Sequence, residues 1–122
     1  MKFVNPLPFV ADIDRSKRFY CEVLQLRVLE DHGDFVRFSD GFALHDGPSL
    51  HRTVFGESRL EDGPYGRRNL VFYFEDEDID AAFERIAGRV ELIHGISEQS
   101  WGQRVFRFFD PDGHIIEIGE PQ

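Results

Sequence analysis

The chain has 122 residues and a formal net charge of −9, so it has the length of one domain and a strongly acidic balance. This charge argues against nucleic acid and anionic membranes as partners. No stretch approaches the roughly eighteen consecutive apolar residues of a membrane helix. The single cysteine cannot form an internal disulfide, which agrees with a reducing compartment, and we expect a cytoplasmic protein.

The first third of the sequence predicts one helix and four strands. Residues 2–10 form the first strand, but Pro6 and Pro8 lack the amide hydrogen of a central strand, so this strand should lie at an edge or pair on one side. Asp12 or Asp14 then caps a helix that runs to about residue 24. Three short strands with glycine-containing turns between them follow at 26–30, 34–38 and 42–46.

The rest of the chain predicts a connecting segment and a second group of the same kind. Residues 47–68 contain four glycines and two prolines and show no sustained apolar period, so we expect a loop there. A strongly apolar strand at 69–75 precedes a helix that Asp76 or Asp78 caps and Gly88 ends. Strands at 90–96, 104–109 and 114–118 complete the chain, and a turn at 110–113 joins the last two into a hairpin.

The two halves also repeat one another residue by residue. Asn5, Asp12, Asp14 and Phe19 recur 64 positions later as Asn69, Asp76, Asp78 and Phe83. The turn Asp40-Gly41 resembles Asp112-Gly113, and Val36-Arg37-Phe38 resembles Phe106-Arg107-Phe108.

The repeat gives a meaning to Glu117, a carboxylate between isoleucines. On the wet face of a two-sided strand this residue would need no explanation. Its counterpart in the first half, however, is His45, which also lies in an apolar strand. A pseudo-twofold axis between the halves would bring Asn5, His45, Asn69 and Glu117 towards one centre, so we expect Glu117 to face a cavity.

These features resemble the vicinal oxygen chelate superfamily, which includes glyoxalase I, extradiol dioxygenases, fosfomycin-resistance enzymes and bleomycin-resistance proteins. The resemblance is carried by Asp12-Ile13-Asp14-Arg15-Ser16 with Phe19-Tyr20, by Trp101-Gly102-Gln103-Arg104, and by Asp110-Pro111-Asp112-Gly113-His114 with Glu117. It implies an α+β fold in which two tandem βαβββ modules, at 1–46 and 69–122, form a curved, cup-shaped mixed sheet within a single domain of residues 1–122. It also implies a homodimer whose paired modules complete each cavity.

The same resemblance implies where a metal would bind in the metal-dependent members. The ligands would come from Asn5, a residue at or beside His45, Asn69 and Glu117, on the first and last strands of each module. Asparagine stands at both positions where glyoxalase I typically has histidine, and an amide oxygen is a weak ligand for zinc, nickel or iron. Tight binding of a transition metal is therefore disfavoured, and with it a dioxygenase activity. A weakly bound divalent metal held by His45 and Glu117 stays open.

The sequence favours a metal-free cavity that binds a small organic molecule, as in the bleomycin-resistance branch. Such a site needs apolar walls with a few placed polar groups. The predicted ligand-binding residues are Asn5, Leu7, Phe9, Asn69, Val71, Tyr73, Trp101, Arg104 and Ile115. The alternative is a lyase or isomerase, metal-free or dependent on a divalent metal, that uses His45 and Glu117 as its base and acid.

Overall fold

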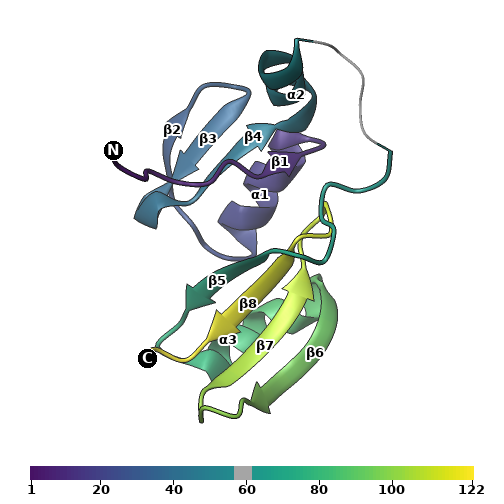
Figure 1. The fold of residues 1–122 in the computed structure, drawn as a ribbon. Coiled ribbons are helices and arrows are strands. Elements are labelled where there is room, and N and C mark those ends of the chain that lie inside the picture. The colour runs from purple at the N-terminus through teal and green to yellow at the C-terminus, as the bar shows by residue number, and fades with distance from the viewer. Residues whose placement is uncertain (57–61) are drawn as a thin grey trace. The chain divides into compact units, whose positions relative to one another are not determined.

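The computed structural model describes residues 1–56 and 62–122, and it divides the chain into two compact units (Figure 1). The first unit spans Met1–Tyr65 and the second spans Gly66–Gln122. Residues 57–61, which belong to the expected connecting segment, lie outside the described part. None of the helices in the described ranges combines the length and the apolar character that crossing a membrane requires.

The first unit is a four-stranded mixed sheet with the strand order β1-β4-β3-β2. Strand β1 runs parallel to β4, and the other neighbours are antiparallel. Its elements are β1 (Phe9–Val10), α1 (Ile13–Glu22), β2 (Val28–Asp31), β3 (Phe35–Phe38), a short 3-10 turn (Ser39–Gly41), β4 (Ala43–Asp46) and α2 (Gly47–Phe55).

The second unit has the same arrangement, with the strand order β5-β8-β7-β6 and with β5 parallel to β8. Its elements are β5 (Val71–Glu75), α3 (Ile79–Ile86), a 3-10 turn (Ala87–Arg89), β6 (Glu91–Glu98), β7 (Arg104–Phe109) and β8 (Ile115–Gly119). The tandem βαβββ topology and the α+β fold class are therefore confirmed. The joining of the two sheets into one cup stays a prediction.

An aspartate begins the first helix of each module, but not at equivalent positions. The Asp12 side chain accepts a hydrogen bond from the Arg15 amide at the start of α1, and Asp78 accepts one from the Ala81 amide at the start of α3. Each caps an amide that the helix itself leaves unpaired. In the repeat Asp12 matches Asp76 and not Asp78, so the two modules use different members of the same Asp-x-Asp pair.

One face of each sheet packs against a helix. Tyr20 of α1 is fully buried beside Phe38 of β3, and Phe83 of α3 meets the Phe106 ring edge-on at 5.2 Å. Burying one such aromatic side chain stabilises the fold by about 1.5–3 kcal/mol. The second unit, all of whose residues are described, has a single α-helix, which lies behind the sheet in Figure 1. The other face of that sheet is therefore free of helices from its own unit.

Helix α2 occupies the first part of the segment where we predicted only a loop. Asp46 caps this helix by accepting a hydrogen bond from the Ser49 amide at 2.9 Å, and Pro48 lies in its first turn. Gly56 ends the helix in the left-handed region, with φ of 72°. A capping aspartate, an early proline and a terminal glycine are start and stop signals for a helix. They outweigh the missing apolar period, so the prediction of a structureless connection is wrong for residues 47–55.

The first strand is also much shorter than the predicted 2–10. Only Phe9–Val10 pairs with β4, although the carbonyl of Pro8 still accepts a hydrogen bond from the His45 amide at 3.1 Å. Proline cannot extend the ladder as a donor. Residues 1–7 consequently lie outside the sheet, and Phe3 and Leu7 are exposed.

The strand register corrects one equivalence within the repeat. His45 lies opposite Phe35, whereas Glu117 lies opposite Arg107. His45 and Glu117 take the same position in their hairpins, so the structural counterpart of Arg107 is Phe35. The sequence alignment that matched Arg107 with Arg37 is therefore wrong by two positions.

Candidate functional site

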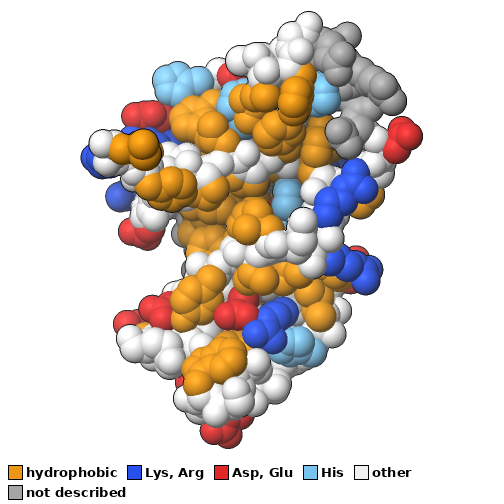
Figure 2. All heavy atoms as spheres, in the orientation of Figure 1, with side chains coloured by type: hydrophobic (Ala, Val, Ile, Leu, Met, Phe, Trp, Pro, Cys, Tyr) orange, Lys and Arg blue, Asp and Glu red, His pale blue; other side chains and the backbone are white. Residues whose placement is uncertain are grey.

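The open face of the second sheet carries one polar side chain from each of its four strands. Tyr73 of β5 lies opposite Glu117 of β8, Glu117 lies opposite Arg107 of β7, and Arg107 lies opposite His94 of β6. Directly opposed residues point to the same face of a sheet. These four residues therefore form a line across the sheet, which we call the polar row. Figure 2 shows acidic, basic and histidine side chains among apolar ones on this face, in the lower half of the view.

Apolar side chains flank the polar row. Val71, Ile115 and Phe109 are neighbours in register on the same face. Val71 is 44% exposed, and the other two are half-buried. The guanidinium of Arg68 lies over the Phe109 ring, 5.5 Å from its centroid. The face thus combines accessible apolar surface with a few fixed polar groups.

Glu117 is held by Arg107 and not by a histidine or an asparagine. The Nε of Arg107 donates to Oε2 of Glu117 at 2.6 Å. The Glu117 side chain is only 13% exposed, and that of Arg107 is 25% exposed. Such a charge-assisted contact at short range is stronger than a neutral hydrogen bond. The carboxylate that seemed isolated in the sequence therefore has its own counter-ion on the neighbouring strand.

Arg107 also fixes the tautomer of His94. Its Nη1 lies 3.0 Å from Nε2 of His94, and Nδ1 of His94 lies 2.7 Å from the carbonyl oxygen of Gly95. A guanidinium can only donate, so Nε2 must accept and Nδ1 must carry the proton. The Nη2 of Arg107 reaches Oε1 of Gln99 only at 3.4 Å. That nitrogen is the least engaged donor of the group.

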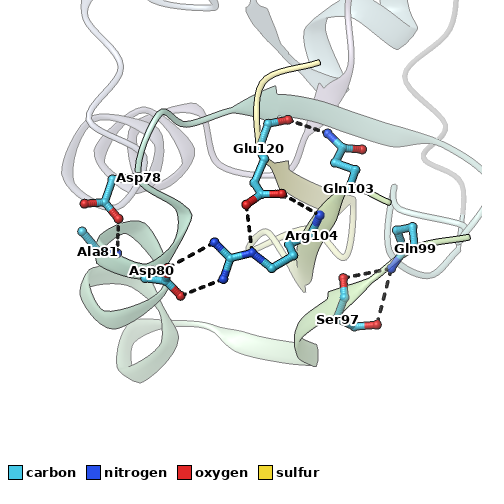
Figure 3. Close-up of polar contacts among 8 residues, drawn as sticks. All are labelled: Asp78, Asp80, Ala81, Ser97, Gln99, Gln103, Arg104 and Glu120. Atoms are coloured by element: carbon cyan, nitrogen blue, oxygen red, sulfur yellow. Dashed lines mark hydrogen bonds and ion pairs between the residues drawn. The ribbon is translucent and has the colours of Figure 1, made fainter. Parts of the chain in front are cut away.

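A second cluster lies at one end of the same face, around the buried amide of Gln103. Oε1 of Gln103 accepts a hydrogen bond from the indole Nε1 of Trp101 at 2.9 Å. Nε2 donates to the hydroxyl of Tyr73 at 2.8 Å and to the backbone carbonyl of Glu120 at 2.6 Å, the latter visible in Figure 3. We call Tyr73, Trp101 and Gln103 the aromatic corner. Its amide is 4% exposed, whereas Tyr73 is 47% and Trp101 58% exposed.

Two further residues complete this corner. The Tyr73 hydroxyl donates to Oε2 of Glu75 at 2.6 Å. Burial of the hydroxyl and then this hydrogen bond raise the pKa of Tyr73, so the phenol stays a neutral donor at pH 7. Gly119 lies beneath the cluster, where a Cβ atom would overlap the Gln103 amide and crowd the Tyr73 ring. Only glycine leaves room for this network.

Arg104, which we predicted to bind the ligand, serves a different set of contacts. Its Nε donates to Glu120 at 2.8 Å, and its two terminal nitrogens each lie 3.2 Å from a carboxylate oxygen of Asp80 on α3 (Figure 3). Arg104 and Arg107 are separated by an odd number of positions along β7, so their side chains point to opposite faces of the sheet. Arg104 therefore points to the side of the helix. The guanidinium thereby ties the sheet to α3.

The predicted residues of the first unit have mainly apolar neighbours. His45 lies opposite both Phe9 and Phe35 in register, and its Nδ1 lies 3.0 Å from the carbonyl oxygen of Asp46. Leu7 is 41% exposed and precedes β1. His45 and Glu117 belong to different compact units, and their cooperation in one site stays a prediction.

Neither asparagine of the predicted four-residue centre lies in a strand. Asn5 precedes β1, and its Nδ2 donates to the carbonyl oxygen of Pro6 at 2.8 Å. Asn69 is exposed and precedes β5. The meeting of these two asparagines with His45 and Glu117 at one centre stays a prediction.

The residues around Glu117 do not fit a tightly bound transition metal. The carboxylate already faces the guanidinium of Arg107, and the acceptor nitrogen of His94 faces the same group. A divalent cation there would have to displace or repel a resident cation. The remaining neighbour of Glu117 in the polar row is the Tyr73 phenol, which is a neutral donor at pH 7.

A buried cluster at the β7–β8 turn has the composition of a metal site but serves the turn. Ligand atoms of Asp110, Asp112 and His114 lie within 4.8 Å of one another. Oδ1 of Asp110 accepts the backbone amides of Asp112 and His114, and Oδ2 contacts Nδ1 of His114 at 2.8 Å. These bonds satisfy groups that the tight turn would otherwise leave unpaired. They explain the sequence Asp-Pro-Asp-Gly-His without a ligand.

Comparison with known proteins assigns the family. The model of the glyoxalase-like domain family matches residues 3–122. The chain belongs to this family. It therefore belongs to the vicinal oxygen chelate superfamily, as its motifs predicted.

Similar proteins agree with this assignment. A crystal structure of a protein of unknown function from Agrobacterium tumefaciens is 58% identical, with a TM-score of 0.96 over 100% of this chain and 95% of that one. The uncharacterized protein YraH of Bacillus subtilis is 25% identical over 97% of both chains. A glyoxalase/bleomycin resistance protein/dioxygenase from Nocardioides shares the fold at 23% identity, with a TM-score of 0.76 over 98% of this chain and 83% of that one.

Proposed function

We propose that this glyoxalase-like protein binds a small organic molecule on the open face of its second sheet. The observation that carries the proposal is the polar row, whose placed donors and acceptors lie among accessible apolar side chains. Ligand sites have this composition, with apolar walls for affinity and a few polar groups for orientation. Val71 and Ile115 supply apolar contact, and Nη2 of Arg107 supplies a donor in the middle of the face.

We also propose that the ligand is held without a tightly bound transition metal. The support is the Arg107–Glu117 pair, which places a cation where the superfamily resemblance would place a metal. Elemental analysis of protein purified without chelators tests this point. Stoichiometric metal that is lost on His45→Ala or Glu117→Gln would overturn it.

Thermal unfolding of dialysed protein against a panel of metabolites and antibiotics tests ligand binding. A molecule that binds only the native state raises the unfolding temperature. Val71→Arg puts a long cation onto the face and should abolish the shift. Val54→Arg, at a 59% exposed position of α2, is the matched control and should leave it intact. A panel without a stabilising compound, or a shift that survives Val71→Arg, contradicts the proposal.

We further propose that two copies of the chain associate, as the family resemblance implies. Phe3 and Val4 are 82% and 73% exposed, which offers apolar surface for a second copy. Light scattering should give a dimer mass that Phe3→Asp shifts towards the monomer. A monomer at every concentration would show that the chain acts alone.

The alternative activity, a lyase or isomerase that uses His45 and Glu117, stays a prediction from the sequence. It requires turnover of a ligand found in the screen and loss of that turnover in His45→Ala. Binding without turnover supports the binding protein instead.

A further inference from the structure

We infer that the aromatic corner is a stacking site for a planar organic cation. This inference rests on the proposed binding function and names the ligand class of the same face. Trp101 and Tyr73 would contact the ligand, and Gln103 is a positioning residue that acts through them.

The corner holds exposed aromatic side chains in fixed orientations. An indole that is 58% exposed would ordinarily sample several rotamers, but the Nε1 of Trp101 is bonded to Oε1 of Gln103 at 2.9 Å. The same amide bonds the Tyr73 hydroxyl at 2.8 Å, so one buried group orients both rings. Ordering the rings before binding reduces the entropy that a ligand must otherwise offset.

The backbone beneath the corner is shaped for this amide. Gly119 lies opposite Glu75 in β5, and a side chain at Gly119 would collide with the Gln103 amide. The amide therefore occupies the space that a side chain would fill in an ordinary strand. The aromatic rings, not the polar amide, are left on the accessible side, because Gln103 is 4% exposed.

The charge of the corner favours a cation. Glu75 accepts hydrogen bonds from the Tyr73 hydroxyl and from the Gln122 amide at 3.1 Å, and no Lys, Arg or His of the described residues forms an ion pair with it. The nearby carboxylates differ, because Glu117 pairs with Arg107 and Glu120 pairs with Arg104. The corner thus presents the negative charge of Glu75, which has no basic partner among the described residues, on a protein of net charge −9.

A flat ring with a delocalised positive charge matches both observations. The ring can stack on indole and phenol faces, whose electron density attracts cations. Its charge can lie near Glu75. A compact cation lacks the stacking surface, and a flat anion would be repelled by the carboxylate.

Four probes separate ring stacking from charge. N-methylquinolinium is a planar cation, quinoline at pH 8 is its neutral relative, quinoline-2-carboxylate is an anion, and tetramethylammonium is a cation without a ring. Trp101 is the single tryptophan of the chain, so its indole N–H gives one nuclear magnetic resonance signal from the site itself. Calorimetry supplies affinities for the variants that lack this signal.

N-methylquinolinium should move the indole signal and bind about three- to tenfold more tightly than quinoline. Trp101→Leu should weaken its binding about tenfold, since one stacked ring contributes on that order. Glu75→Gln should remove most of the preference for the cation over quinoline. Gln103→Met should shift the indole signal of the free protein and weaken binding in the same direction. Phe55→Leu and Glu77→Gln, both at exposed positions, are matched controls and should change nothing.

Three outcomes overturn the inference. The first is equal or tighter binding of the anion or the neutral ring, and the second is affinity that Trp101→Leu leaves unchanged. The third is no binding of any probe at millimolar concentration. A compound from the general screen can also separate the two proposals. If Val71→Arg abolishes its binding and Trp101→Leu leaves its binding unchanged, the proposed function stands and this inference alone fails.

Discussion

Replacing Gln103 by methionine should destabilise the protein by about 2 kcal/mol. Methionine keeps the length and volume of the side chain, so the packing loss is small. The variant loses hydrogen bonds to the Tyr73 hydroxyl, the Glu120 carbonyl and the Trp101 indole. Each such bond contributes on the order of 1 kcal/mol. Water can replace the bond at the exposed indole, which leaves two bonds in the sum.

Urea unfolding followed by Trp101 fluorescence measures this cost directly. Gln99→Met is the matched control, because the Gln99 side chain makes only long hydrogen bonds to the described residues, at 3.3, 3.5 and 3.4 Å. We expect this control to lie within about 0.5 kcal/mol of the wild type, as surface substitutions usually do. If Gln103→Met costs no more than Gln99→Met, the buried amide is not the centre of the corner. A second readout is the indole N–H resonance, which should move in Gln103→Met alone.

Three further outcomes follow from the described contacts. Arg107→Met, Glu117→Gln and the double variant should show a coupling energy of about 1–2 kcal/mol in urea unfolding, between the values of exposed and buried ion pairs; additive costs would refute the pair. Hydrogen bonds from the Arg104 backbone and side chain hold the pKa of Glu120 below its ordinary value. The stabilisation of the fold by ionised Glu120 is therefore fully present above the unfolded-state pKa of about 4.3. It is lost as the pH falls through the lower pKa that Glu120 has in the folded protein. Glu120→Gln should therefore lower the unfolding free energy at pH 7 but not at pH 2, and a constant difference across this range would contradict the assignment. Gly66→Ala would force a Cβ into the backbone of the β7–β8 turn and should cost about 2 kcal/mol or more, whereas a thermal unfolding curve like that of the wild type would show that the turn can yield.

The fold could be predicted because its signals are local and occur twice. Both helices begin at aspartates, both hairpins turn at Asp-Gly, and the apolar strands have the expected order. Helix α2 was missed because its signals are only its two ends, Asp46 and Gly56, with no apolar period between them. The first strand was predicted to be too long. Pro8 has no amide hydrogen to donate, and whether pairing ends there depends on the hydrogen bonds that the partner strand β4 offers.

The candidate site could be predicted only in part, because its contacts depend on register. Simple alternation puts Val71 with Tyr73 and Ile115 with Glu117, and the register brings the two pairs to one face. Arg107 was missed because its position opposite Glu117 depends on the number of residues in the turn between β7 and β8. Aligning Arg107 with Arg37 gave a register that is wrong by two residues.

The contacts of the aromatic corner could not be predicted either, because they join residues that lie far apart in the sequence. Gln103 was part of a motif in the sequence, but its partners Tyr73 and Glu120 lie 30 and 17 positions away. The role of its amide follows from the Gly119 backbone beneath it, which alternation does not reveal. Arg104 was assigned to the ligand from proximity to Trp101 alone, although the period of two along β7 puts it on the side of α3.

Comparison of the two modules explains why a carboxylate is tolerated in β8. The position opposite His45 in the first sheet is Phe35, so a glutamate in place of His45 would be half-buried and would face an uncharged ring. In the second sheet the equivalent position is Arg107, and the Glu117 side chain, 13% exposed, has that guanidinium 2.6 Å away. The pair orients Arg107 in turn, since its Nε is fixed on Glu117 while Nη2 stays weakly engaged towards the open face. The Arg107 contact therefore accounts for the place of Glu117 between two isoleucines, because the carboxylate holds the guanidinium in position on the open face.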